Sequence, residues 1–237
     1  MKSSLKNMVI VLFSITAISA LLVALVNDMT KDAIALSQQQ TKNLAKFIVL
    51  DTTAEEARVE RDTTINIGDF AVTASTVVRH SDSSIIGYAV EAPSITKSGY
   101  ADRIILMVGF IEQEGEAIIN GVEVLSQKET PGLGANMTKA DNSLLRSIAK
   151  RNPAELKYYV SKEGGSFDAL TGSTISSRAY ANAVETAYAG YLWATGRLNT
   201  SDEALNAAVS GATATGATLP YENRTEPEAQ KGDIENE

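Results

Sequence analysis

The chain contains no cysteine among its 237 residues. Disulfide frameworks, cysteine-held iron–sulfur clusters and cysteine-ligated zinc are therefore excluded. The single histidine, His80, stands beside Ser81 and Asp82 in a predicted turn, so histidine triads and multi-histidine metal sites are excluded by count. No Gly-x-Gly-x-x-Gly unit joins a predicted strand to a helix, so nothing in the sequence predicts a nicotinamide-binding site. We expect no metal ligands and no complete active site in this chain alone.

Basic residues are also in the minority. Lysine and arginine total 21 against 29 aspartates and glutamates, which gives a net charge of −8 and a pI near 4.8. Because nucleic-acid binding depends on a basic surface, this balance argues against a nucleic-acid partner. The length allows one sizeable domain with appendages.

One long apolar run is present near the N-terminus. Met8–Val26 has no charged residue over 19 positions, about the length that crosses a bilayer. No small-x-small cleavage site follows it, so we expect an uncleaved signal anchor. Because Lys2 and Lys6 precede the run, the positive-inside tendency places residues 1–7 in the cytoplasm. The expected location is single-pass in the cell inner membrane, with the main domain periplasmic or otherwise extracytoplasmic.

A membrane-proximal helix and linker are expected over residues 27–64. Residues 31–50 carry apolar positions on one side of a helix, and residues 51–62 are dense in glutamate and arginine. Such a charged stretch is typical of a solvated linker. Residues 65–199 then form the predicted extracytoplasmic domain.

The next segments favour strands. They are rich in β-branched and apolar residues, and a Glu-Gly-Glu turn at 114–116 separates the last two. A four-stranded antiparallel sheet with helices on one side, an α+β fold, is the natural assembly. The expected strands are 70–78, 85–91, 103–111 and 117–125. Asp141 is expected to cap a short helix over 142–150.

The most informative stretch is 168–177, Asp-Ala-Leu-Thr-Gly-Ser-Thr-Ile-Ser-Ser. It precedes a run from Ser176 to about Thr195 with apolar residues at helical spacing. Hydroxyl residues at this place are ordinary N-cap chemistry. The alternative is that the same N–H groups and the helix dipole hold a phosphate.

This stretch resembles the attachment motif of the FMN-binding family, an acidic residue followed by Ser/Thr-Gly-Ala/Ser-Thr. In that family a flavin transferase joins the FMN phosphate to the last threonine as a phosphoester. The resemblance implies a covalent FMN on Thr174, with Thr171, Gly172 and Ser173 beside it and Asp168 helping the transferase recognise the acceptor. Ser173 departs from the usual alanine, a change between small residues.

A second motif, Glu129-Thr130-Pro131-Gly132-Leu133-Gly134, follows the last predicted strand. By itself it is a turn, because proline presets φ and glycine adopts conformations closed to other residues. Its sequence and its place before the threonine motif also resemble the FMN-binding family. That resemblance implies that Glu129, Thr130 and Leu133 lie near the isoalloxazine ring or the phosphate.

The C-terminal residues 200–237 are small, polar and acidic, and we expect a low-complexity, disordered tail. The tail holds Ser-Gly-Ala-Thr at 210–213 and Thr-Gly-Ala-Thr at 215–218, both close to the usual acceptor tetrapeptide. Neither has an acidic residue three positions upstream, and neither opens a predicted helix. Thr174 therefore remains the favoured acceptor.

The resemblance implies electron transfer, because FMN accepts two electrons and can release them singly. Since no nicotinamide site is predicted, electrons must come from and go to partner subunits. Among single-span members, the layout resembles the G-subunit family of Rnf complexes. These move electrons between ferredoxin and NAD and couple the transfer to sodium or proton translocation. The implied partners are the other membrane and iron–sulfur subunits and the flavin transferase.

Three alternatives stay open at this stage. The chain also resembles the FMN-carrying C subunit of sodium-translocating NADH:quinone reductases. A stand-alone, membrane-anchored FMN domain would carry the same motifs. A scaffold without a cofactor is the third alternative.

Overall fold

The computed structural model describes residues 5–67 and 69–198. The chain divides into two compact units, Met1–Ala45 and Lys46–Glu237. The predicted tail at 200–237, its threonines and the first four residues of the predicted cytoplasmic segment lie outside the described residues.

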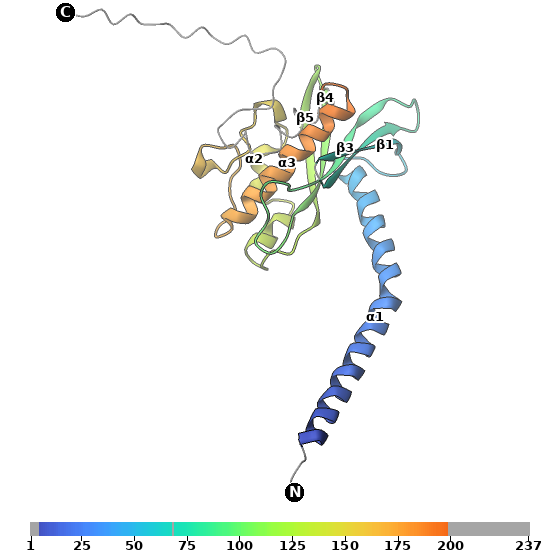
Figure 1. Cartoon of the computed structure of the whole chain (residues 1–237). Helices are drawn as coiled ribbons and strands as arrows, with labels where there is room; N and C mark the ends of the chain where they lie inside the picture. Colours follow the sequence, from blue (N-terminus) through green and yellow to red (C-terminus); the bar gives the residue numbers. More distant parts are fainter. Residues whose placement is uncertain (1–4, 68, 199–237) are drawn as a thin grey trace, which may run out of the picture. The chain divides into compact units, whose positions relative to one another are not determined.

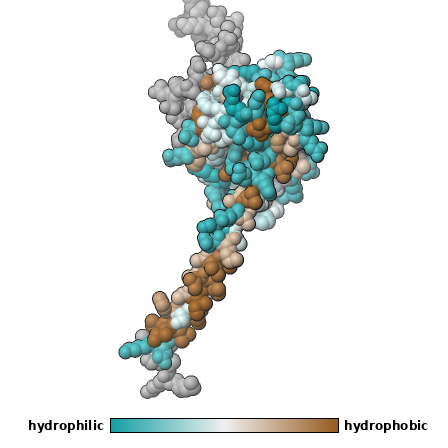
Figure 2. All heavy atoms as spheres, turned by 90° about the vertical axis from the view of Figure 1, so that its right-hand side faces the viewer, coloured by the Kyte–Doolittle hydropathy of each residue, from teal (hydrophilic) through white to brown (hydrophobic). Residues whose placement is uncertain are grey.

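Helix α1, Leu5–Ile48, contains the apolar run. Its 19-residue segment Met8–Val26 rises about 28 Å, close to the thickness of a bilayer's hydrocarbon core. The large apolar side chains of this segment are exposed, as the brown helix in Figure 2 shows. Within the described chain, Lys6–Ile48 is the one helix long and apolar enough to cross a membrane.

An antiparallel five-stranded sheet forms the second unit. Its strands follow one another in space in their order along the chain, so each strand pairs with the next (Figure 1). The strands are β1 (Ala57–Ile67), β2 (Phe70–Arg79), β3 (Ile85–Pro93), β4 (Ile105–Gln113) and β5 (Glu116–Ser126). The predicted antiparallel α+β fold is confirmed.

The number of strands differs from the prediction. Residues 57–62, assigned to the linker, belong to β1, which pairs with β2 from Ala57 opposite Arg79 to Ile67 opposite Phe70. β1 is an edge strand, and its central residues are largely exposed. Edge strands tolerate charges that discourage further pairing, so the alternation of apolar residues that marks an inner strand is missing here.

Helix α3, Thr174–Ala194, covers one face of the sheet and packs on β2, β3 and β4. The largest buried side chains of this layer include Tyr180 and Tyr191 of the helix and Phe110 of β4. Burying an apolar side chain such as Phe110 contributes about 1.5–3 kcal/mol. Gly190 allows the helix to approach closely, because a Cβ there would lie 2.6 Å from Val72 Cγ1. The predicted helix is confirmed.

Short helices connect β5 to α3. They are η1 (Gly134–Thr138), α2 (Ser143–Ile148), η2 (Pro153–Glu155) and η3 (Ser161–Glu163). The cap of α2 is Asn142, whose side chain accepts from Leu145 N at 2.9 Å. The prediction of Asp141 as the cap was wrong by one residue, because the side chain at 142 is the one that reaches the helix backbone.

The other face of the sheet receives the segment that follows α1. A Cβ on Gly109 would lie 2.1 Å from Val49 O, and one on Gly121, paired with Gly109 across the strands, 3.1 Å from the same oxygen. Asn120 Nδ2 donates to Val49 O at 2.9 Å. Gly109 and Gly121, which have no side chains, thus leave the space in which the Val49 backbone lies, and we call this pair the glycine seat. The side-chain amide of Asn120 fixes the position of that backbone.

We predict that Gly109→Ala destabilises the second unit by about 1–3 kcal/mol, because the methyl group overlaps the Val49 carbonyl. Ala71→Val, at an exposed position of β2, is the matched control and should change stability by less than about 0.5 kcal/mol. Denaturant unfolding of the full chain in detergent measures both. Equal stability of the two variants would contradict the role of the glycine seat.

Candidate functional site

Thr174 is the first residue of α3, and a compact turn places it there. Ser177 Oγ donates to Ser173 O at 2.8 Å and accepts from Leu170 N at 3.0 Å, which ties the helix to the residues before it. Gly172 has φ of +72°, a left-handed conformation that favours glycine. The Thr-Gly-Ser-Thr sequence therefore folds into a turn that ends at a helix N-terminus.

The first turn of α3 has no side-chain cap among the described residues. Ser173 is buried, and its Oγ is without a hydrogen-bond partner in the part of the chain that the structure describes. The ordinary N-cap interpretation is thus not realised at Ser173. The N–H groups of a first turn have no partner within the helix, and the dipole favours negative charge there. This helix start suits a phosphate group.

The Glu129 side chain connects the two sequence motifs. It is 6% exposed; Oε1 accepts from Tyr100 N at 2.7 Å, and Oε2 accepts from Ser176 Oγ. Two glycines make room for the carboxylate: a Cβ on Gly99 would lie 2.2 Å from Oε1, and one on Gly134 2.7 Å from Oε2. Glu129 therefore holds the loop after β3, the loop after β5 and the start of α3 together.

The loop after β5 brings Leu133 to the threonine motif. Its turn is closed by Leu133 N donating to Thr130 O at 3.1 Å, and Thr130 itself is exposed. A Cβ on Gly172 would lie 3.3 Å from Leu133 Cδ2, so the leucine side chain lies beside the glycine of the 171–174 turn. Of the predicted site residues, the structure brings Glu129 and Leu133 to the start of α3.

Asp168 is placed differently. Its carboxylate is exposed and accepts from Ser161 Oγ at 2.5 Å, while its backbone N donates to Ser147 Oγ at 3.1 Å. Nearby on α3, Arg178 Nε donates to Glu163 Oε1 at 2.9 Å. The Arg178 hydrogen bond lowers the pKa of the Glu163 carboxyl below its ordinary value. Asp168 thus belongs to the loop that precedes the 171–174 turn.

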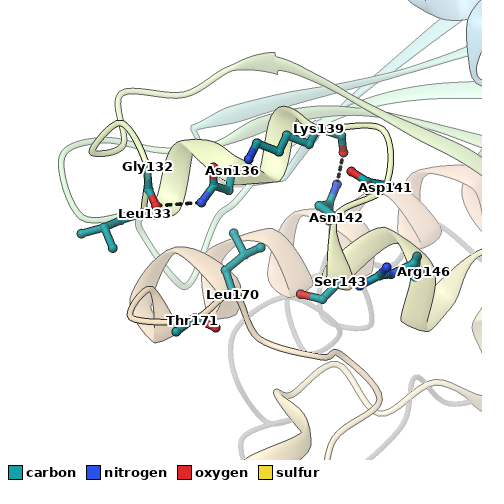
Figure 3. A pocket seen from close by; sticks show the side chains of 10 residues that line it. All are labelled: Gly132, Leu133, Asn136, Lys139, Asp141, Asn142, Ser143, Arg146, Leu170 and Thr171. Atoms are coloured by element: carbon teal, nitrogen blue, oxygen red, sulfur yellow. Dashed lines mark hydrogen bonds between the residues drawn. The ribbon is translucent and has the colours of Figure 1, made fainter.

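An open hollow of about 440 Å³ lies beside both motifs (Figure 3). Figure 3 shows the Leu170 side chain between the loop that carries Asn136 and the segment that carries Ser143. Buried Asn142 fixes that loop, because its Nδ2 donates to Met137 O at 2.9 Å and to Lys139 O at 2.7 Å. The lining residues are Gly132, Leu133, Asn136, Lys139, Asp141, Asn142, Ser143, Arg146, Leu170 and Thr171.

Comparison with known proteins identifies the family. The model of the FMN-binding domain matches residues 99–189. The G subunit of the ion-translocating oxidoreductase complex from Shewanella piezotolerans is 32% identical over 196 residues, covering 78% of this chain and 88% of the relative. The chain belongs to this G-subunit family.

Two further members of the G-subunit family support the assignment. The Aliivibrio fischeri (strain ATCC 700601 / ES114) protein is 33% identical over 202 residues, covering 76% of this chain and 86% of the relative. The G subunit of the Na⁺-translocating ferredoxin:NAD⁺ oxidoreductase complex of Acetobacterium woodii is 28% identical over 182 residues. The match covers 74% of this chain and 86% of the relative. The predicted resemblance is confirmed.

The residues shared with the FMN-binding domain run from Gly99 through most of α3. They include all three segments that Glu129 connects. Sequence reasoning did not assign a role to Ser176 or Ser177, although both hold the start of α3 through their hydroxyl groups. Two adjacent serines inside a first helical turn, where serine has modest helix propensity, were the available signal.

We predict that Glu129→Ala destabilises the second unit by about 1–3 kcal/mol, because Tyr100 N and Ser176 Oγ lose a buried acceptor. Glu129→Gln keeps the size of the side chain and one carbonyl oxygen, so the loss should be clearly smaller. Thermal unfolding of the full chain compares the two. An alanine variant as stable as wild type would remove the connecting role from Glu129.

Proposed function

We propose that this chain is the FMN-carrying electron-transfer subunit of a membrane-bound ion-translocating oxidoreductase complex. Its match to the FMN-binding domain and its kinship with the G subunits of such complexes support this function. When bound, FMN would supply electron transfer between two-electron and one-electron carriers. By analogy with the Acetobacterium relative, the complex couples electron transfer between ferredoxin and NAD to sodium or proton translocation.

The site suits a covalent phosphoester between FMN and Thr174 Oγ1. Thr174 begins a 21-residue helix, and its side chain is half-buried at the end of the turn that Gly172 forms. The uncapped first turn and the unpartnered Ser173 hydroxyl supply donors for a phosphate. Because Thr171 and Gly172 are both exposed, they would leave space for a transferase to reach the Thr174 hydroxyl. A separate flavin transferase would form the bond.

The surface near the acceptor turn suits a flat, largely apolar group. Tyr100 is 75% exposed, Leu133 45% and Ile175 51%. Glu129 connects their segments, since its carboxylate accepts from Tyr100 N and from the hydroxyl of Ser176, the neighbour of Ile175. Exposed apolar side chains on segments connected in this way are typical of a ligand or partner surface. Leu133 would lie against the flavin ring, with Thr130 at the edge of the same loop.

The location follows from the N-terminal helix. We propose that residues 8–26 cross the cell inner membrane once, with the N-terminus cytoplasmic and the FMN domain periplasmic. Lys2 and Lys6 before the span support this orientation. The partners are the other membrane and iron–sulfur subunits of the complex. A covalent link would keep the flavin on a domain that faces away from the cytoplasm.

The test of the attachment site is co-expression of the full chain with a flavin transferase. The denatured wild-type band should fluoresce in a gel, and Thr174→Val should remove this fluorescence, because valine keeps the shape but lacks the oxygen. The matched control is the tail double variant Thr213→Val/Thr218→Val, which should fluoresce like wild type. A fluorescent Thr174→Val band would place the flavin elsewhere, and a dark wild type would contradict the covalent link.

Asp168 is proposed to help the transferase recognise the acceptor. Asp168→Ala should lower the flavin yield per chain in a short co-expression while leaving the unfolding temperature close to that of wild type, because the side chain is exposed. Ser161→Ala is the matched control, since it removes the hydrogen bond but keeps the carboxylate. A yield lowered equally by both changes would assign Asp168 a purely structural role in its loop.

A further inference from the structure

The hollow beside the acceptor turn contains two cations without ion-pair partners among the described residues. Lys139 and Arg146 both line it, and neither side chain has a hydrogen bond or salt bridge to another described residue. In Figure 3 the Lys139 side chain runs back toward Asn136, and Arg146 stands beside Ser143. Asp141 is the one acidic side chain in the lining, so the hollow has a net positive charge.

This charge contrasts with the rest of the chain. The protein as a whole has a net charge of −8, whereas the lining of the hollow carries two cations and one carboxylate. A net positive, partly enclosed space in an acidic protein attracts a negatively charged ligand. The remaining lining includes Leu133 and Leu170, which suits a ligand with an apolar ring and an anionic edge.

The hollow is next to the proposed attachment point. Thr171 lines it, and Thr174 begins the helix three residues later. Leu133 belongs to both places, since it lines the hollow and lies 3.3 Å from where a Cβ of Gly172 would be. A ring tethered by its phosphate to the start of α3 would therefore lie next to this hollow.

We propose that Lys139 and Arg146 stabilise the reduced, anionic form of the flavin and so raise its reduction potential. The proposal rests on the proposed function, since it requires FMN at this site. Reduction adds negative charge to the pyrimidine part of the ring, and a cation a few ångströms away favours the more negative state. The charges of Lys139 and Arg146 raise the potential, whereas the carboxylate of Asp141 lowers it.

The experiment measures the midpoint potential of the flavin in the full, co-expressed chain by spectroelectrochemistry. Lys139→Gln and Arg146→Gln should each weaken the preference for reduced flavin by about tenfold, which lowers a two-electron potential by about 30 mV. Asp141→Asn should shift the potential in the positive direction. Lys139→Arg keeps the charge and should keep the wild-type potential.

Arg79→Gln is the matched control, because it removes one exposed cation at the end of β2 and changes the net charge equally. Its potential should equal that of wild type. Since the potential is measured on flavin already bound, incomplete loading of a variant does not affect the comparison.

The outcomes separate this proposal from the function on which it rests. In one outcome, the wild-type band fluoresces but Lys139→Gln and Arg146→Gln have the wild-type potential. That result would overturn the tuning role without contradicting the FMN function. An equal shift in Arg79→Gln would also overturn it, because the effect would then follow from net charge alone. A wild type without flavin would overturn both.

Discussion

The buried carboxylate of Glu129 is the interaction on which the candidate site depends. It accepts one hydrogen bond from the loop after β3 and one from the first turn of α3, and Glu129 itself lies in the loop after β5. A buried carboxylate is costly unless its oxygens are hydrogen-bonded, so the three segments must meet in one arrangement to satisfy it. The 171–174 turn, the Leu133 loop and the exposed Tyr100 are held together in this way.

The sheet supplies the rigid support for this arrangement. One face packs against α3, which carries Thr174 at its start, and the other face receives Val49 on Gly109 and Gly121. An ion pair also holds the segment around Val49 to the sheet, because Lys46 Nζ lies 2.9 Å from Asp62 Oδ1 on β1. Although burial opposes ionisation, hydrogen bonds from Ser75 and Lys46 lower the pKa of Asp62 below its ordinary value. Both faces of the sheet in the FMN-binding domain are thus packed against other segments of the chain.

Much of this fold could be predicted from local sequence. The apolar run, the inner strands and the long helix each follow from a periodicity that burial imposes. β1 could not be predicted in this way, because an edge strand rich in charges lacks that periodicity. The family motifs indicated Glu129 and Leu133, but their roles depend on Tyr100 and Ser176, distant in sequence and joined only by folding. The hollow with Lys139 and Arg146 likewise arises from residues on separate short segments.

The central claim is that Thr174 carries FMN, and tryptic peptide mapping by mass spectrometry tests it most directly. Cleavage after Lys162 and Arg178 yields the peptide 163–178, which contains Thr174, whereas Thr213 and Thr218 fall in the separate peptide 198–224. The account predicts an FMN phosphoester on peptide 163–178, with fragment ions placing the added mass on Thr174. An adduct confined to peptide 198–224, or no adduct in chain purified with its transferase, would contradict it.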